Sequence, residues 1–263
     1  MAGACAAIEL DRPQRLLALR QELRRLERGV AAPAPLALGL PPVDAALGGG
    51  LALGALHEIT GGPEDAAADG FAAALLGRLV AARGRPVLWC PAGDDLYAPG
   101  LGGLGLDPGR VILARVGRPA DRLWAMEEGL RSPALAGVLG ELPALGLTDG
   151  RRLQLAAESG GTLGLVLLRG RRRGGMEERP SAATSRWRVV AAPAPPADPA
   201  AGKGGRIALL GSEQRWTTDG PARLVGPPRW RIELTRCRGG RPGDWLVEWD
   251  ETYRFRLAAA LRD

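Results

Sequence analysis

Residues 61–71 occupy a place in the chain where a phosphate-binding loop would stand. Gly61 and Gly62 follow a predicted strand over residues 55–60 and precede a predicted helix over residues 71–82. A loop of this kind binds phosphate through backbone N–H groups, a lysine, and a Ser or Thr hydroxyl that holds magnesium. Residues 61–71 contain neither a lysine nor a hydroxyl side chain. The glycines and the flanking elements of such a loop are therefore present, but the side chains that bind phosphate and magnesium are missing.

Acidic residues in the same segment also disfavour a nucleotide. Glu64, Asp65 and Asp69 would repel a triphosphate, and Asp69 is followed by Gly70 just before the helix. Backbone amides at the start of that helix still favour an anion. Without the lysine and the magnesium ligand we expect no productive binding of ATP or magnesium, no other cofactor, no metal site and no enzymatic activity. A divergent ATPase, in which other residues bind the phosphates, is the alternative.

A basic loop follows the strand predicted over residues 162–168. Arg169, Arg171, Arg172 and Arg173 place four arginines within five residues. Such a cluster neutralises phosphates and gives salt-dependent binding to DNA. It is equally compatible with an acidic protein partner or with a solvated loop.

A second group of arginines lies near the C-terminus. Arg236 and Arg238 are two residues apart in a predicted hairpin, so they should project from one face, with Arg241 close by. They suit bidentate contacts with phosphates or carboxylates. Trp245 lies next to them in sequence. The hairpin's tryptophans either pack it onto the domain or form an exposed Arg/Trp interface.

The remaining reactive residues favour no catalytic site. His57 is the only histidine, and a single imidazole inside a predicted strand is expected to be a core residue with its hydrogen bonds satisfied. The three cysteines lack the spacing of metal ligands, and their odd number argues against a disulfide framework. We expect a cytoplasmic, nucleoid-associated protein with no secretion signal and no membrane-spanning stretch.

Length and composition limit the architecture. The chain has 263 residues, of which 46% are hydrophobic and only 4% aromatic, so the core must consist mainly of Leu, Val and Ala. The net charge of +6 permits contact with DNA or acidic proteins. Nearly all of the positive charge is arginine, which a GC-rich genome also favours.

Strands and helices alternate through the middle of the chain. This alternation predicts a parallel sheet covered by helices on both faces. Strands are expected over residues 55–60, 86–90, 111–114, 137–140 and 162–168, and helices over 71–82, 118–131 and 151–159.

The two ends of the chain differ from this core. Residues 8–29 form a predicted amphipathic helix, and a Pro/Ala linker at 31–35 follows it. After a predicted strand at 186–191 comes a Pro/Ala/Gly loop at 193–205. The C-terminal portion is predicted to be rich in β structure, with a weak strand at 206–210, a hairpin formed by 229–236 and 245–249, and a last strand or helix within 253–261.

Two motifs in this order resemble those of the ImuA family of bacterial DNA-damage mutagenesis cassettes. The first is Leu-Pro-x-x-Asp-x-x-Leu-Gly-Gly-Gly-Leu at residues 40–51, followed by Gly-x-Leu-His-Glu-Ile at 54–59. The second is Arg-Trp-Arg-Ile-Glu-Leu-x-Arg-Cys-Arg-Gly-Gly-Arg-Pro-Gly at 229–243, followed by Trp-Leu-Val-Glu-Trp at 245–249. The resemblance covers roughly residues 36–257.

The resemblance implies a RecA-like α/β fold and an accessory role in SOS-induced translesion DNA synthesis. The implied partners are an inactive Y-family polymerase homologue called ImuB, an error-prone replicative-type DNA polymerase, and RecA itself. Contact with DNA is possible and need not be direct. The expected domains are an N-terminal helix and linker at residues 1–35 and a degenerate RecA-like core at 36–263.

The same resemblance assigns places to other residues. RecA-like ATPases carry a catalytic glutamate just after the second core strand, where this chain has Asp94 and Asp95 in a displaced register; their other interpretation, which we favour, is a solvated acidic turn or a helix cap. Glu141 stands near the position of the Walker B aspartate, and its other reading is an acidic interaction point at the edge of the sheet. Arg169–Arg173 would lead toward a DNA channel, and Arg236 and Arg238 lie where RecA carries a finger that reaches a neighbouring ATP.

Overall fold

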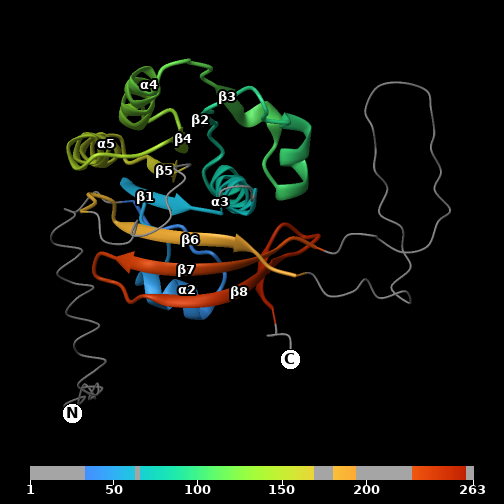
Figure 1. Cartoon of the computed structure of the whole chain (residues 1–263). Helices are drawn as coiled ribbons and strands as arrows, with labels where there is room; N and C mark the ends of the chain where they lie inside the picture. The colour runs from blue at the N-terminus through green and yellow to red at the C-terminus, as the bar shows by residue number, and fades with distance from the viewer. Residues whose placement is uncertain (1–32, 63–65, 169–179, 194–226, 259–263) are drawn as a thin grey trace, which may run out of the picture.

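The computed structural model describes residues 33–62, 66–168, 180–193 and 227–258. The predicted helix at 8–29, all but the first residue of the predicted loop at 193–205, and the predicted weak strand at 206–210 lie outside these ranges. Nearly all of the strands and helices predicted for the core are present (Figure 1). The helices are α2 (Pro41–Leu47), α3 (Ala67–Arg83), α4 (Pro119–Arg131) and α5 (Leu147–Gly160).

The strands form one continuous sheet. They are β1 (Ala55–Thr60), β2 (Val87–Cys90), β3 (Val111–Leu113), β4 (Gly137–Leu142), β5 (Leu163–Leu168), β6 (Ser185–Ala191), β7 (Arg229–Cys237), β8 (Gly243–Trp249) and β9 (Phe255–Leu257), in the order β3-β2-β4-β5-β1-β6-β7-β8-β9. In this sheet order, the first six strands, from β3 to β6, are parallel to their neighbours. From β6 to β9, each strand is antiparallel to the next. The β-rich C-terminal portion predicted from the sequence therefore extends the parallel sheet.

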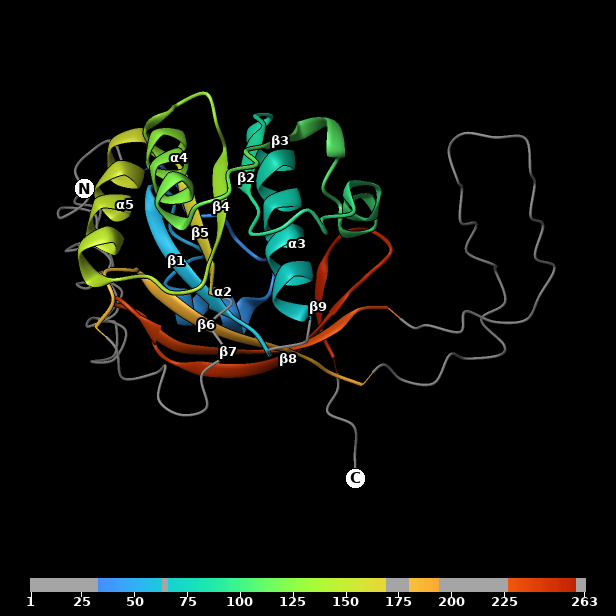
Figure 2. The ribbon, with the colours of Figure 1, turned by 45° about the horizontal axis from the view of Figure 1, so that its top comes forward.

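Helices cover the two faces of the sheet unequally. α4 and α5 pack on one face, over the parallel strands (Figure 2). α2 and α3 pack on the other face, where their apolar residues share a core with β1, β5 and β6–β8. The face of β6–β8 on the α4/α5 side is not covered by either helix (Figure 1). Within the described ranges, no helix has the length and apolar character needed to cross a lipid bilayer.

Local sequence explains most of the element ends. α4 begins at Pro119, whose fixed φ suits the first helical position. α3 and α5 end at Gly84 and Gly161, which adopt left-handed backbone angles of φ 65° and 62°. β5 is a continuous apolar run, LGLVLL, as expected for a strand buried on both faces.

Two helices begin earlier than the sequence predicts. α3 begins at Ala67 rather than at residue 71, and α5 at Leu147 rather than at residue 151. Neither start has a side-chain cap, since the N-cap residues are Ala66 and Gly146. The usual polar start signal is therefore missing from the sequence at both places.

The interface between α4 and α5 depends on a glycine. A Cβ built on Gly160 would lie 2.0 Å from the carbonyl oxygen of Leu130 at the end of α4. The backbones of the two helices therefore approach too closely for any side chain at this position. Arg152 of α5 also donates to Glu127 of α4, so the pair is joined by an ion pair along its length.

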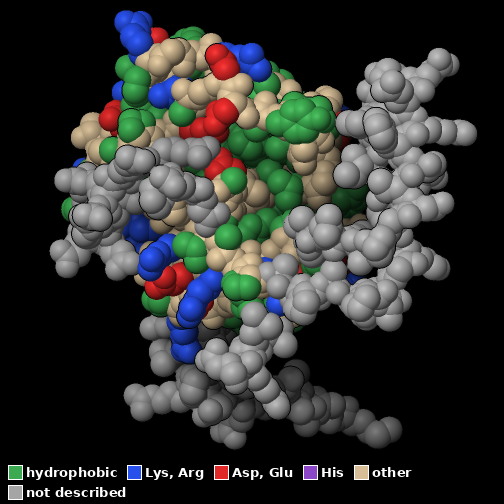
Figure 3. Space-filling view, turned by 45° about the vertical axis from the view of Figure 1, so that its right-hand side comes forward, with side chains coloured by type: hydrophobic (Ala, Val, Ile, Leu, Met, Phe, Trp, Pro, Cys, Tyr) green, Lys and Arg blue, Asp and Glu red, His purple; other side chains and the backbone are tan. Residues whose placement is uncertain are grey.

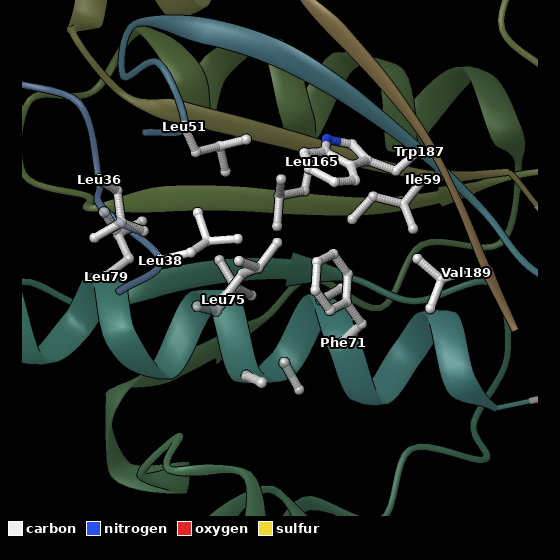
Figure 4. Close-up of a cluster of buried hydrophobic side chains, with 14 of the residues drawn as sticks. Leu36, Leu38, Leu51, Ile59, Phe71, Leu75, Leu79, Leu165, Trp187 and Val189 are labelled. Atoms are coloured by element: carbon white, nitrogen blue, oxygen red, sulfur yellow. The ribbon is translucent and has the colours of Figure 1, made fainter. Parts of the chain in front are cut away.

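The main core lies between α3 and the sheet. Phe71, Leu75 and Leu79 project from α3 toward the strands (Figure 4). They meet Ile59, Leu165, Trp187 and Val189, all of which are buried in the same cluster. Although aromatic residues are few, they gather where the start of α3 meets the antiparallel strands.

The turn between β8 and β9 is built around one carboxylate. Asp250 accepts hydrogen bonds from the backbone N–H groups of Thr252 (2.8 Å) and Arg254 (3.0 Å), from the Thr252 hydroxyl (2.6 Å), and from the Arg256 guanidinium. Desolvation raises the pKa of this carboxyl, but the hydrogen bonds together outweigh it and hold the pKa below its ordinary value of 3.8.

Replacing Asp250 with asparagine should therefore destabilise the protein in a pH-dependent way. A carboxyl whose pKa is depressed in the folded state contributes stability that is present above its unfolded pKa of about 3.9 and is lost as the pH falls through the folded pKa. We expect Asp250→Asn to lower the free energy of unfolding by about 1 kcal/mol at neutral pH. Denaturant titrations should show this difference vanish near pH 2 or below. A difference that is equal at both pH values would contradict the role of the charge.

Candidate functional site

The turn between β1 and α3 stands at the carboxyl end of the parallel strands, where open α/β sheets bind ligands. Gly61 and Gly62 lie in this turn and are half-buried. Because α3 begins at Ala67, Asp69 and Gly70 lie inside the helix and not in a loop before it. The sequence interpretation of these two residues as the end of a degenerate loop is corrected in this respect. The alanine-rich start of α3 is helical from Ala67 onward.

Gly70 brings the start of α3 against the C-terminal strands. A Cβ built on Gly70 would lie 3.2 Å from Cζ2 of Trp230 on β7. The next residue, Phe71, contacts the rings of Trp187, Trp230 and Phe255 at centroid distances of 6.1, 6.1 and 5.5 Å. The first turns of α3 are thus packed against an aromatic cluster formed by the late strands of the sheet.

Glu141 lies in β4 near the position implied for the Walker B aspartate. Its side chain is buried, with a relative exposure of 4%. The carboxylate accepts hydrogen bonds from the indole Nε1–H of Trp89 (2.9 Å) and from the backbone N–H of Ala92 (3.2 Å). The interpretation of Glu141 as an acidic interaction point at the carboxyl edge of the sheet is therefore wrong, because its side chain is buried and its carboxylate accepts hydrogen bonds within the fold.

The segment that leaves β2 is held from two sides. Glu141 holds the N–H of Ala92, and Arg122 of α4 donates from Nη1 to the carbonyl oxygens of Pro91 (3.3 Å) and Ala92 (3.2 Å). Arg122 is itself buried. This is the place where the resemblance put a catalytic carboxylate. The structure shows two side chains there, Glu141 and Arg122, that make three hydrogen bonds to the main chain.

Asp94 and Asp95 follow this segment and are exposed. The side chain of Asp94 is 85% exposed, and its nearest cation, Arg115, lies 3.9 Å away. These residues match the solvated acidic turn that the sequence allowed.

Cys90, at the end of β2, is buried and reduced. Burial raises the pKa of its thiol to about 12, against the opposing effect of the Arg122 charge. Because the thiolate is the reactive form, Cys90 is not suited to act as a nucleophile at neutral pH.

His57 is a buried residue with both ring nitrogens hydrogen-bonded, which confirms the expectation from the sequence. Its Nε2 lies 2.8 Å from the carbonyl oxygen of Ala52, so this nitrogen carries the proton and donates. Nδ1 then accepts from the Ser185 hydroxyl at 2.6 Å, and that hydroxyl accepts from Trp187 Nε1–H at 2.8 Å. The network is complete with a neutral imidazole and joins β1 to β6.

The C-terminal arginines lie at the other end of the sheet. Cys237 of β7 pairs with Ser185, which pairs with His57 near the start of β1. Arg236 and Arg238 therefore lie at the amino end of the parallel strands, away from Gly61. Arg236 Nη1 donates to the carbonyl of Ser181 (2.7 Å) and Arg238 Nη2 to that of Ala182 (3.4 Å).

Arg236 and Arg238 lie together as predicted, since they donate to the carbonyls of two consecutive residues. β7 carries a bulge at Thr235, where the register with β6 shifts. Beyond the bulge the pairing continues, because the backbone N–H of Arg238 donates to the carbonyl of Thr184. Arg241 is exposed in the turn after β7.

The tryptophans of the hairpin mainly pack it onto the domain. Trp230 and Trp249 are buried in the main core, and Trp245 is half-buried against it. Arg169, Arg171, Arg172 and Arg173 lie outside the described residues, so their predicted contact with DNA or a partner stays a prediction. The described residues on either side of these arginines, Leu168 and Pro180, lead to opposite ends of the sheet.

Sequence reasoning missed two buried ionic groups. One is Arg122, which lies four residues before Met126 in the sequence. This spacing is the only sequence feature that places it on the buried side of α4. The other is the pair formed by Glu58 of β1 and Arg186 of β6, with Nε and Oε2 2.8 Å apart. These two residues are 128 positions apart in the chain, so no local pattern joins them.

Comparison with known proteins defines the class. The crystal structure of the RadB recombinase matches this chain with a TM-score of 0.56 and 17% identity, over 85% of this chain and 100% of that one. Together with the sheet order and the two helical layers, this likeness shows that the chain has a RecA-like fold. No protein-family model matches the sequence.

Two curated relatives give the family. The protein named ImuA from each of two strains of Caulobacter vibrioides is 40% identical over 254 residues, which is 90% of this chain and 95% of the relative. The chain therefore belongs to the ImuA family.

Proposed function

We propose that this protein is a non-catalytic adaptor in SOS-induced translesion DNA synthesis. In this role it acts with an ImuB-type polymerase homologue and an error-prone replicative-type polymerase, and it contacts RecA. The membership of the ImuA family supports this role, and the RecA-like fold is consistent with it.

One observation carries the non-catalytic part of the proposal. Glu141, the acidic residue nearest to the Walker B position, uses its carboxylate to accept hydrogen bonds from the buried indole of Trp89 and from the backbone N–H of Ala92. A carboxylate used in this way is not directed toward a magnesium ion. The lack of lysine and hydroxyl side chains in residues 61–71 adds to this argument.

The experiment that tests the adaptor role is co-purification of the full chain with an ImuB-type polymerase homologue and, separately, with RecA. We expect a stable complex with the polymerase homologue that does not depend on added ATP. A chain that begins at residue 31 tests whether the N-terminal segment contributes. Deleting the last 35 residues is not a suitable test, because it would remove β7, β8 and β9 from the sheet. Failure of the folded full chain to bind either partner would reject the proposal.

A further inference from the structure

The face of β6–β8 on the α4/α5 side carries a ladder of ion pairs. Arg188 faces Glu233 at 3.8 Å, and Arg229 faces Glu248 at 2.7 Å. Both pairs are formed by residues directly opposite each other on neighbouring strands. Figure 3 shows basic and acidic side chains next to each other in the lower part of the molecule.

Arg231 on β7 and Arg256 on the neighbouring strand β9 are also paired. Arg231 makes a bidentate contact with Asp244, and Arg256 pairs with Asp250. Over most of this face, each arginine is therefore neutralised by a nearby carboxylate.

This pairing stops at the bulge. Arg236, Arg238 and Arg241 are exposed, and among the described residues no carboxylate lies within 4.0 Å of their guanidinium groups. Arg236 and Arg238 each donate one N–H to a main-chain carbonyl. A guanidinium has five N–H donors, so both retain donors for another acceptor while their positions are fixed.

The turn that carries these arginines is held in place. The backbone N–H of Arg241 donates to the carbonyl of Ala46 on α2 at 2.9 Å. A Cβ built on Gly240 would lie 2.3 Å from the same carbonyl oxygen, so only glycine allows this approach. A fixed turn lowers the entropy lost when a ligand binds its side chains.

A hollow of about 480 Å³ opens beside the arginines. Arg186, Arg236, Glu233 and Asp244 line it together with Leu234, Thr235, Pro242 and Gly243. Glu233 and Asp244 would repel a continuous phosphate backbone, whereas a segment whose carboxylates are separated by neutral side chains can place those side chains beside the two carboxylates and the exposed Pro242. This mixture suits a peptide better than a nucleic acid.

The geometry points to a docking site for an acidic, extended segment of a partner protein at Arg236, Arg238, Arg241 and the adjoining hollow. The carboxylates of the segment bind the three arginines, and its intervening side chains enter the hollow. This inference rests on the proposed adaptor function, since it names the surface and the kind of partner segment that the adaptor uses.

The test measures fluorescence anisotropy of a labelled peptide of alternating Glu and Ser, with six carboxylates, against the full chain at low salt. A labelled oligothymidylate with six phosphodiester groups carries the same charge and serves as the nucleic-acid comparison. We expect the peptide to bind more tightly than the oligothymidylate. We also expect the triple variant R236A/R238A/R241A to weaken peptide binding about tenfold or more.

A matched variant controls for net charge. R85A/R110A/R151A also removes three exposed arginines, of which Arg85 and Arg110 likewise donate to main-chain carbonyls. We expect the affinity of this control variant for the peptide to stay within about threefold of that of the unmodified chain. The variant R236K/R238K/R241K keeps the charge and controls for a loss of folding. Its affinity for the peptide should fall about threefold or more, because lysine lacks the planar guanidinium.

Three results of the anisotropy test would overturn the inference: no peptide binding by the unmodified chain, oligothymidylate bound at least as tightly as the peptide, or an equal loss of affinity in the control variant. The adaptor proposal is tested separately, by binding of the partner proteins. If the polymerase homologue binds the triple variant as well as the unmodified chain, this surface is wrong and the adaptor role stands. If no partner binds the unmodified chain, the adaptor role itself falls.

Discussion

Replacing Glu141 with alanine is expected to destabilise the protein by about 2–5 kcal/mol, because it leaves one buried and one partly buried donor without their acceptor. These donors are the indole N–H of Trp89 and the backbone N–H of Ala92, which now bind the two oxygens of the carboxylate at 2.9 and 3.2 Å. The free energy of unfolding, measured by denaturant titration, checks this expectation.

The variant Glu141→Gln is the control for this prediction. It keeps the shape of the side chain and one acceptor oxygen, so it should lose clearly less stability than Glu141→Ala. If Glu141 were a catalytic residue, the opposite pattern would appear: Glu141→Ala would fold as stably as the unmodified chain and lose an activity. That result would contradict the structural role assigned here.

Replacing Phe71 with alanine should cost about 3–5 kcal/mol, the usual range for a large aromatic removed from a core. Phe71 is fully buried and contacts the rings of Trp187, Trp230 and Phe255. Its loss would separate the start of α3 from β6, β7 and β9. Thermal or denaturant unfolding, followed by tryptophan fluorescence, measures the effect.

Phe71→Leu is the matched change, since it keeps most of the apolar volume and should cost roughly half as much or less. We also expect Phe71→Ala to shift tryptophan emission toward that of solvated indole, because Trp187 and Trp230 lose a neighbour. A Phe71→Ala protein with unchanged stability and emission would show that the aromatic cluster does not fasten α3 to the late strands.

The parallel strands were predictable because their composition reports their burial. β5 is an apolar run of six residues, and its burial on both faces follows from that pattern. Helix starts were less predictable. Ala66 and Gly146 provide no side-chain cap, so tertiary packing decides where α3 and α5 begin.

The candidate sites could be predicted only where chemistry is local. The missing lysine near Gly61 is visible in the sequence, and so is the isolation of His57. The bulge at Thr235 is not visible, since it depends on how β7 pairs with β6. The contact of Arg122 with the segment after β2 also joins distant parts of the chain and has no local pattern.

Isothermal titration calorimetry of the purified full chain with ATP and magnesium tests the central claim most directly. With about 1 mM ATP, the upper end of typical enzyme affinities, the account predicts no saturable heat of binding and no release of phosphate. Magnesium-dependent binding with turnover of ATP, lost in a folded Glu141→Ala variant, would contradict it.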